Sequence, residues 1–376
     1  MKILRISVIG SAGIPANYGG FETLVHNLAE FHHRNHLNLE LVVYCSEKNY
    51  ETLPARFLDT KLRYLPLSAN GIWSIPYDIW SILRAVINKS DVLLVLGISG
   101  AVVLPVLHLL CRKRVVTNID GIEWRREKWH CLARWFLRFF EYLAVRYSDV
   151  VVADNTAIET YLHRKYGVQA AVIAYGGDHA LQSESTRPNQ IDLPSDYALS
   201  VCRIEPENNI HIILEAFSNT PDVPLIMVGN WNNSAYGQNL RSTYVDRSSL
   251  HLLDPIYDPG ILKYLRSNAR VYVHGHSAGG TNPSLVEAMH FGIPVLAFDC
   301  DFNRSTTEEC CLYFSDVALL VGQLKQVGCP KMSSIGAKMK EIAVRRYTWE
   351  VVAKQYFDLL VNKNEMAFPR HSFHHP

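Results

Sequence analysis

The chain has 376 residues, of which 48% are hydrophobic and 19% are charged, and its 37 Lys and Arg residues nearly balance its 36 Asp and Glu residues. This length favours two domains of ordinary size, and the composition excludes disorder as the dominant state. The net charge of +1 argues against bulk nucleic acid as a partner, although it leaves room for a local basic patch.

Cysteine spacing and the first residues bear on the compartment. The eight cysteines include no CxxC pair, so neither a zinc ribbon nor a thioredoxin motif is present. The opening MKILRISVIG lacks the charged and then apolar leader of a secretory signal. We therefore expect reduced thiols and a cytoplasmic location.

Residues 92–111 carry no formal charge and have the length of a membrane span. They also contain Gly97, Gly100 and Pro105, and they begin with the strand-like run VLLVL. A buried strand, a glycine turn and a buried helix explain the same residues, and we favour this interpretation over a span.

Strand and helix signals alternate along the chain. Apolar runs predict strands at residues 3–9, 39–44, 92–96, 114–118, 150–153, 197–201, 225–228, 271–274 and 295–298. Apolar spacing predicts helices at residues 21–31, 210–217, 284–291 and 349–360. The pattern stops at a polar, proline-containing stretch and then restarts, which is typical of two α/β units joined by a linker.

We therefore predict an α/β fold with two Rossmann-like domains facing a cleft. The expected parts are a first domain at residues 1–180, a linker at 181–196, a second domain at 197–345, and a C-terminal helix and tail at 346–376. Ligands of such sheets bind at the carboxyl ends of the strands.

The first candidate site is the loop after the first strand, which contains Gly10, Gly13, Gly19 and Gly20. Glycines let a backbone approach a ligand closely, and the amides of the following helix attract an anion. The loop lacks GxGxxG and the lysine of a phosphate-cradling loop, so hydride transfer becomes less plausible. A turn that serves packing alone is the alternative.

The second candidate site follows the strand at residues 271–274 and reads HGHSAGGTNPSLVEA. We expect a helix to begin near Pro283, with amides and hydroxyls of Gly280, Thr281 and Ser284 available to a diphosphate. Glu287 lies one turn inside, where a carboxylate can accept hydrogen bonds from ribose hydroxyls. A capped core helix is the alternative.

These motifs resemble those of the metal-independent, two-domain glycosyltransferases of the GT-B fold, and specifically glycosyltransferase family 4. Residues 271–299 resemble the family's donor segment, residues 201–217 its GR-x-x-x-E-K-G element, and residues 18–22 its first glycine loop. The similarity spans residues 3–360. It is strongest with bacterial rhamnosyltransferases of capsule and O-antigen biosynthesis, through GIPANYGGFE, DGIEWRR-x-KW and HGHSAGGTNPSL-x-EA.

The resemblance implies a retaining transferase that moves a hexose, here rhamnose from dTDP-rhamnose, onto a lipid-linked or growing surface polysaccharide. It implies no metal or other cofactor. The expected donor-binding residues are Gly19, Gly20, Arg203, Asn208, Gly279, Gly280, Thr281, Asn282, Ser284, Leu285 and Glu287.

Two positions depart from the family pattern. The family has two glutamates eight residues apart; Glu287 matches the second, whereas Gly279 stands at the first. Backbone amides or His276 would then replace the missing side-chain contact to the donor sugar. Asn208 stands at the family lysine, which leaves Arg203 to face the diphosphate without its usual partner.

Charge decides what the donor site has to do. Transfer from a nucleotide sugar builds negative charge on the departing diphosphate, which amides, a helix terminus and one guanidinium can stabilise without metal. Arg203 is the expected guanidinium, and an interdomain salt bridge is its alternative role. Residues 299–301 spell DxD, a metal signature in another transferase fold, which we interpret as coincidence.

The segment after the strand at residues 114–118 is the expected acceptor side. Asp120 and Glu123 are the candidate catalytic carboxylates, with Asp120 as a turn residue before Gly121 as the alternative. Asp120 stands near a family position that touches the donor sugar. Further expected acceptor-side residues are Phe21, Glu22, Trp124 and Arg125.

Aromatic residues recur at helical spacing between residues 129 and 143, among an excess of cations. Such a helix suits an anionic bilayer surface, and a packed core helix with a solvated basic face explains it equally well. Because the implied acceptor is lipid-linked, we expect peripheral contact with the inner face of the plasma membrane.

Two other functions stay open. A nucleotide-sugar epimerase uses the same two-domain fold and needs no acceptor. A non-catalytic sugar-nucleotide sensor or assembly partner would explain the two missing family side chains.

Overall fold

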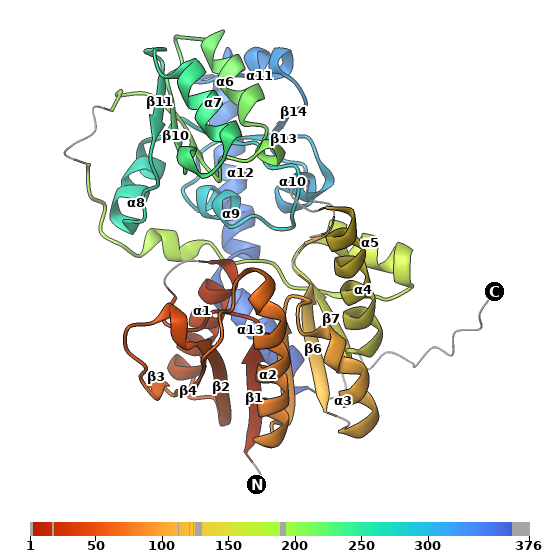
Figure 1. Ribbon diagram of the computed structural model, residues 1–376. Coiled ribbons are helices and arrows are strands. Elements are labelled where there is room, and N and C mark those ends of the chain that lie inside the picture. The colour runs from red at the N-terminus through yellow and green to blue at the C-terminus, as the bar shows by residue number, and fades with distance from the viewer. Residues whose placement is uncertain are drawn as a thin grey trace. The chain divides into compact units, whose positions relative to one another are not determined.

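The computed structural model describes residues 3–16, 19–111, 113–119, 121–122, 124, 130–188 and 193–362. The chain folds as two compact units, Met1–Ile173 with Val352–Pro376, and Ala174–Val351. Each unit is a parallel sheet wrapped by helices, which confirms the predicted α/β class (Figure 1).

These bounds differ from the expected domain limits. The second unit begins at Ala174 rather than at residue 197, and most of the last helix belongs to the first unit. Packing explains both differences. A β-carbon at Gly177 would meet the backbone of Glu287, so this segment already lies against the second unit. Phe357 stacks on Phe31 with ring centroids 5.6 Å apart, so the last helix packs in the first unit.

The first unit holds an eight-stranded sheet of order β3-β4-β2-β1-β5-β6-β7-β8, in which only β3 runs antiparallel to its neighbour. Its strands are β1 (Leu4–Ile9), β2 (Leu39–Ser46), β3 (Arg56–Phe57), β4 (Thr60–Leu65), β5 (Val92–Leu96), β6 (Arg114–Ile119), β7 (Val150–Ala153) and β8 (Ala171–Val172). Its helices are α1 (Gly20–Arg34), η1 (Glu47–Asn49), η2 (Gly71–Trp73), α2 (Ser74–Ile87), η3 (Ala101–Val103), α3 (Leu104–Leu110), α4 (Cys131–Tyr147), α5 (Thr156–Tyr166) and most of α13 (Trp349–Val361).

The second unit holds a six-stranded parallel sheet of order β11-β10-β9-β12-β13-β14. Its strands are β9 (Ala198–Val201), β10 (Leu225–Val228), β11 (Leu250–Leu253), β12 (Val271–His274), β13 (Val295–Phe298) and β14 (Leu312–Phe314). Its helices are η5 (Asp178–Leu181), η6 (Pro206–Asn208), α6 (Ile210–Ser218), η7 (Trp231–Asn233), α7 (Ala235–Tyr244), α8 (Pro259–Asn268), α9 (Pro283–His290), α10 (Asp301–Thr306), α11 (Val317–Leu324) and α12 (Pro330–Arg346).

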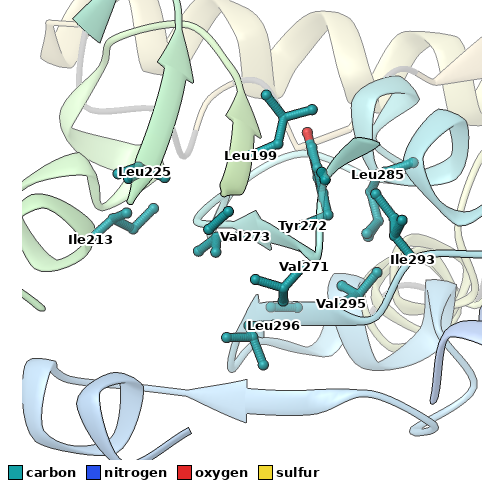
Figure 2. Packing of buried hydrophobic residues seen from close by; sticks show 14 of the residues in the cluster. Leu199, Ile213, Leu225, Val271, Tyr272, Val273, Leu285, Ile293, Val295 and Leu296 are labelled. Atoms are coloured by element: carbon teal, nitrogen blue, oxygen red, sulfur yellow. The ribbon is translucent and has the colours of Figure 1, made fainter. Parts of the chain in front are cut away.

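The core of the second unit explains why its central strands are short apolar runs. All four residues of β12 are buried, because helices cover both faces of a parallel sheet. Figure 2 shows side chains of β12 and β13 packed together with Leu285 of α9. This core fixes α9 at the carboxyl end of β12, where the second candidate site was predicted.

Residues 92–111 form β5, η3 and α3, which confirms the strand, turn and helix that the glycines predicted. Nowhere in the described ranges does a helix combine the length and the apolar run that crossing a bilayer requires.

Candidate functional site

Two loops of the second unit are joined where the neighbouring strands β9 and β12 end. The hydroxyl and the amide of Ser277 donate hydrogen bonds to the carbonyl of Glu207, at 2.8 and 3.0 Å. The side-chain amide of Asn209 donates to the carbonyl of Gly275 at 2.9 Å. We call residues 202–209 and 275–282 the paired loops.

Glycine makes this approach possible. A β-carbon at Gly275 would lie 2.1 Å from the carbonyl oxygen of Asn208, so any other residue would push the paired loops apart. The loops therefore form one layer at the carboxyl edge of the sheet, the edge where ligands of such folds bind.

Arg203 is presented by this layer. It is exposed, and no described residue makes a hydrogen bond or ion pair with its guanidinium. Its carbonyl accepts a 2.7 Å hydrogen bond from the side-chain amide of Asn208, which is 2% exposed. Asn208, at the family lysine position, therefore supports the loop that carries Arg203, and its own contact to a donor stays a prediction.

Helix α9 begins at Pro283, as predicted. The side-chain oxygen of Asn282 accepts hydrogen bonds from the amide of Ser284 at 3.1 Å and from its hydroxyl at 2.8 Å. Leu285 is fully buried, and its amide donates to the carbonyl of Asn282, so a donor contact there would have to replace that bond. Thr281 is also buried, at the entrance of the helix.

Gly279 explains one departure from the family pattern. Its φ is +120°, a conformation that side-chain-bearing residues rarely adopt, although the space around its β-carbon position is open. The loop is therefore shaped for glycine rather than for the family glutamate. Gly280 follows it, half-buried, before Thr281.

His276, the suggested substitute, is 8% exposed, and its ring stacks on that of His274 at 4.4 Å. Burial lowers the pKa of His274 to about 3, so this histidine is neutral. A role of His276 toward a donor sugar stays a prediction.

Glu287 lies in a network that sequence analysis missed. Its carboxylate forms an ion pair with the buried Arg266 and lies 3.3 Å from Nε2 of His179. Trp349 donates to Nδ1 of the same histidine at 2.9 Å. Burial alone would raise the pKa of Glu287, but the charge of Arg266 and the hydrogen bond from His179 outweigh it and lower the pKa. An ionised, oriented carboxylate suits a pair of sugar hydroxyls.

No sequence signal links these partners. His179, Arg266 and Trp349 come from three distant segments that only the tertiary fold brings to Glu287.

The glycine loop of the first unit is braced by Glu22. Its carboxylate accepts a 2.6 Å hydrogen bond from the amide of Ala12. A β-carbon at Gly19 would lie only 2.0 Å from a carboxylate oxygen of Glu22, so glycine makes room for this carboxylate. Gly19 has φ +128°, and Gly20 begins α1 without a side-chain cap from any described residue. Burial raises the pKa of Glu22, although the hydrogen bond from Ala12 opposes this.

Of the other site residues predicted in the first unit, some lie in the described ranges and some do not. Phe21 is half-buried and lies 3.6 Å from the β-carbon position of Gly97, at the end of β5. The contacts of Phe21 and Glu22 to an acceptor stay predictions. The candidate catalytic residues Asp120 and Glu123, with Arg125 and Tyr18, lie outside the described residues.

Trp124 is held by a buried carboxylate that sequence analysis did not single out. Its indole nitrogen donates to Glu141 at 3.2 Å, and Arg138 lies over its ring at 4.0 Å. Glu141 is 1% exposed and also accepts hydrogen bonds from three residues of α5, listed here: Tyr161 at 2.6 Å, Lys165 at 2.9 Å and Tyr166 at 2.6 Å. Glu141 therefore positions Trp124 against α4 and α5.

The DxD residues do not form a metal cage. Asp299 accepts two hydrogen bonds from Arg304, at 2.6 and 2.9 Å. In the part of the chain that the structure describes, His, Cys, Asp and Glu nowhere gather in threes with a geometry that could hold a metal ion. The expectation of a metal-independent reaction stays a prediction.

Family comparisons divide the chain near the same point as the fold. Residues 182–309 match the family model described as glycosyl transferases group 1, and residues 3–178 match a domain of unknown function (DUF1972). No curated protein matches the sequence.

Solved structures match nearly the whole chain. Sucrose-phosphate synthase from Thermosynechococcus elongatus matches with TM-score 0.79 and 17% identity, over 95% of this chain and 98% of the other. HepE from Anabaena, in complex with UDP and glucose, matches with TM-score 0.71 and 16% identity, over 95% and 99%. A putative UDP-N-acetylglucosamine 2-epimerase from Listeria monocytogenes matches with TM-score 0.60 and 12% identity, over 95% of each chain.

The TM-scores establish the fold, whereas identities this low leave the substrate open. The fold is therefore the GT-B fold, and the match at residues 182–309, together with these neighbours, supports a GT-B glycosyltransferase whose second unit carries a glycosyltransferase group 1 domain.

Proposed function

We propose that this chain is a retaining glycosyltransferase that moves a rhamnosyl unit from dTDP-rhamnose onto a lipid-linked or growing surface polysaccharide. The observation that carries the donor assignment is the layer of paired loops. One of these loops carries Arg203, which has no partner among the described residues, and the other leads into α9 at Pro283. Rhamnose and the acceptor rest on the motif resemblance alone.

The geometry suits a departing diphosphate. Charge that develops on the diphosphate meets the amides of residues 279–281 and the guanidinium of Arg203, whose planar fork matches phosphate oxygens. Glu287, ionised by Arg266, accepts a hydrogen bond from the 3′-hydroxyl of the deoxyribose in a dTDP donor, and can accept from both ribose hydroxyls of UDP. In a retaining transfer the leaving phosphate takes the acceptor proton, so neither Asp120 nor Glu123 has to be a strong base.

Calorimetry with dTDP and UDP tests the donor site. Arg203→Ala and Glu287→Gln should each lower nucleotide affinity about 10- to 100-fold, because each removes charge-assisted hydrogen bonds. Arg247→Ala is the matched control. This exposed arginine precedes β11, at the amino ends of the strands, whereas the paired loops follow the carboxyl ends. Unchanged affinity in both test variants would remove the donor-site assignment.

Product analysis separates the alternatives. The likeness to a putative epimerase keeps epimerisation open, and an epimerase converts the nucleotide sugar with no acceptor present. The two missing family side chains, at Gly279 and Asn208, keep a non-catalytic sensor as an alternative, which turnover with a lipid-linked acceptor would exclude. A thermal-shift screen of nucleotide sugars identifies the donor, because a specific ligand raises apparent stability by mass action.

A further inference from the structure

The first unit exposes apolar side chains on three neighbouring helical segments. More than half of the large apolar residues exposed in the described ranges lie between Ile72 and Tyr142. In α3, Leu109 and Leu110 are 78% and 76% exposed, and in α4, Trp135 and Phe136 are 61% and 52% exposed. Such a concentration marks an interaction surface rather than scattered surface residues.

The exposed residues of α4 lie on one side of the helix. Leu132, Trp135, Phe136, Phe139 and Tyr142 recur at spacings of three and four residues, and all five are exposed. Trp135 stacks on Phe139 with ring centroids 5.8 Å apart. The side of α4 that turns away from the protein is therefore a continuous aromatic stripe.

Topology makes these segments one surface. The connections from β4 to β5, β5 to β6 and β6 to β7 all advance in the same direction across the sheet, so right-handed crossovers place α2, α3 and α4 over one face (Figure 1). The inner sides of these helices share one core with that face. His108 of α3 meets Tyr147 of α4 with ring centroids 5.8 Å apart. We call the outer sides of α2, η3, α3 and α4 the outer apolar face.

The exposed charges on these segments have a single sign. The carboxylates within the described residues of α2, η3, α3 and α4 are Asp78 and Glu141, and both are buried. The exposed charged residues are cations, among them Arg84, Arg138 and Arg146. A protein partner or a second copy of this chain would have to bring carboxylates to this face, whereas an anionic bilayer offers negative charge over apolar chains.

We propose that the outer apolar face docks the protein onto an anionic lipid bilayer. The aromatic stripe of α4 and the leucines of α3 enter the boundary between headgroups and acyl chains, and Arg84 and Arg146 contact the lipid phosphates. The docking deepens the proposed function, on which it rests for its purpose, because a lipid-linked acceptor lies at that boundary. Binding to lipid itself needs neither a donor nor an acceptor.

Co-sedimentation of the full chain with vesicles tests the proposal. The protein should bind vesicles of phosphatidylcholine mixed with phosphatidylglycerol, and added salt should weaken this binding. The pair Leu109→Ser with Leu110→Ser, and the pair Trp135→Ser with Phe136→Ser, should each lower the partition coefficient at least tenfold. Val344→Ser and Tyr257→Ser, exposed apolar positions of the second unit, should leave it unchanged.

A charge variant separates the two parts of the surface. Arg84→Gln with Arg146→Gln should weaken binding to the anionic vesicles and reduce its salt dependence, with little effect on phosphatidylcholine alone. The urea midpoint and the nucleotide affinity, measured in parallel, should stay unchanged in all of these variants, and the unchanged urea midpoint shows that the first unit is folded. If the unsubstituted chain binds no nucleotide, the proposed function is contradicted and the docking result still stands.

Three outcomes would overturn the docking proposal. The first is an unsubstituted chain that does not bind anionic vesicles. The second is equal binding by the paired serine variants. The third is self-association without lipid that the same serine substitutions abolish, since the outer apolar face would then be covered by a second copy of the chain.

Discussion

Helices α4 and α12 have the same length, 17 residues, and each packs on the sheet of its unit. They differ in the side that faces solvent, because α12 exposes its polar side and α4 exposes its apolar side. The buried side of α12 is apolar and its outer side carries charged residues such as Lys331, Lys340 and Glu341. The outer side of α4 is aromatic, and its buried side includes the carboxylate of Glu141.

The difference teaches that an apolar stripe in a sequence identifies an amphipathic helix without telling which side faces the core. In α12 burial of the stripe stabilises the fold. In α4 the hydrogen-bond donors around Glu141 fix the inward side, which leaves the stripe to another partner. Substitutions on the two sides of each helix should therefore have opposite consequences.

The largest effect should come from Glu141. Glu141→Ala leaves the hydroxyls of Tyr161 and Tyr166 and the indole nitrogen of Trp124 without their acceptor. Breaking such a buried group of partners should lower the free energy of unfolding by about 3–5 kcal/mol. Urea denaturation followed by circular dichroism measures this loss.

Glu341→Ala on α12 is the matched control for Glu141. This carboxylate is exposed and pairs with Lys338 three residues earlier, so its removal should leave the urea midpoint within experimental error. Equal losses from Glu141→Ala and Glu341→Ala would contradict the assignment of the inward side of α4.

The next largest effect should come from the apolar residues. Met339 on α12 is fully buried, and Met339→Ala should cost about 2–3 kcal/mol of unfolding free energy, because it removes buried methylenes and leaves a cavity. Phe136 on α4 is a larger residue but is exposed, so Phe136→Ala should change stability by no more than about 0.5 kcal/mol. A larger loss from Phe136→Ala would mean that the stripe stabilises the fold.

The sequence predicted those elements whose signal is local. Apolar runs located β1, β5 and β12, because both faces of a parallel sheet are buried. Asn282 with Pro283 marked the start of α9, because an Asx cap followed by proline is a helix entry. The mixed, partly exposed residues of β4 carry no such signal, and that strand was missed.

Tertiary partners could not be predicted in this way. Glu287 was found as a candidate from its own motif, but its partners Arg266 and His179 come from segments with no motif. For α4 the spacing of aromatic residues left membrane and core interpretations equal. Only the exposure of Trp135 and Phe136, with the burial of Glu141, shows which side turns inward.

The smallest effect is a pH dependence at the end of α12. Glu308 accepts hydrogen bonds from Arg345 at 2.6 Å and from Arg346 at 2.9 Å. The hydrogen bond from Arg345 lowers the pKa of Glu308, slight burial opposes it, and Arg346 adds to the lowering. Because the folded pKa lies below the unfolded one, the pair stabilises the protein above the unfolded pKa, and this contribution is lost as pH falls through the folded pKa.

Comparing urea midpoints of the unsubstituted chain and Glu308→Gln tests this pH dependence. The variant should unfold at lower urea at pH 7, and the difference should shrink as the pH falls through the lowered pKa of Glu308, where its carboxylate takes up a proton. Arg146→Gln near the end of α4 is the control, because Arg146 has no carboxylate partner among the described residues and its effect should not change over this range. A difference for Glu308→Gln that stays constant with pH would show that its charge contributes nothing to α12, and would remove one contrast between the two helices.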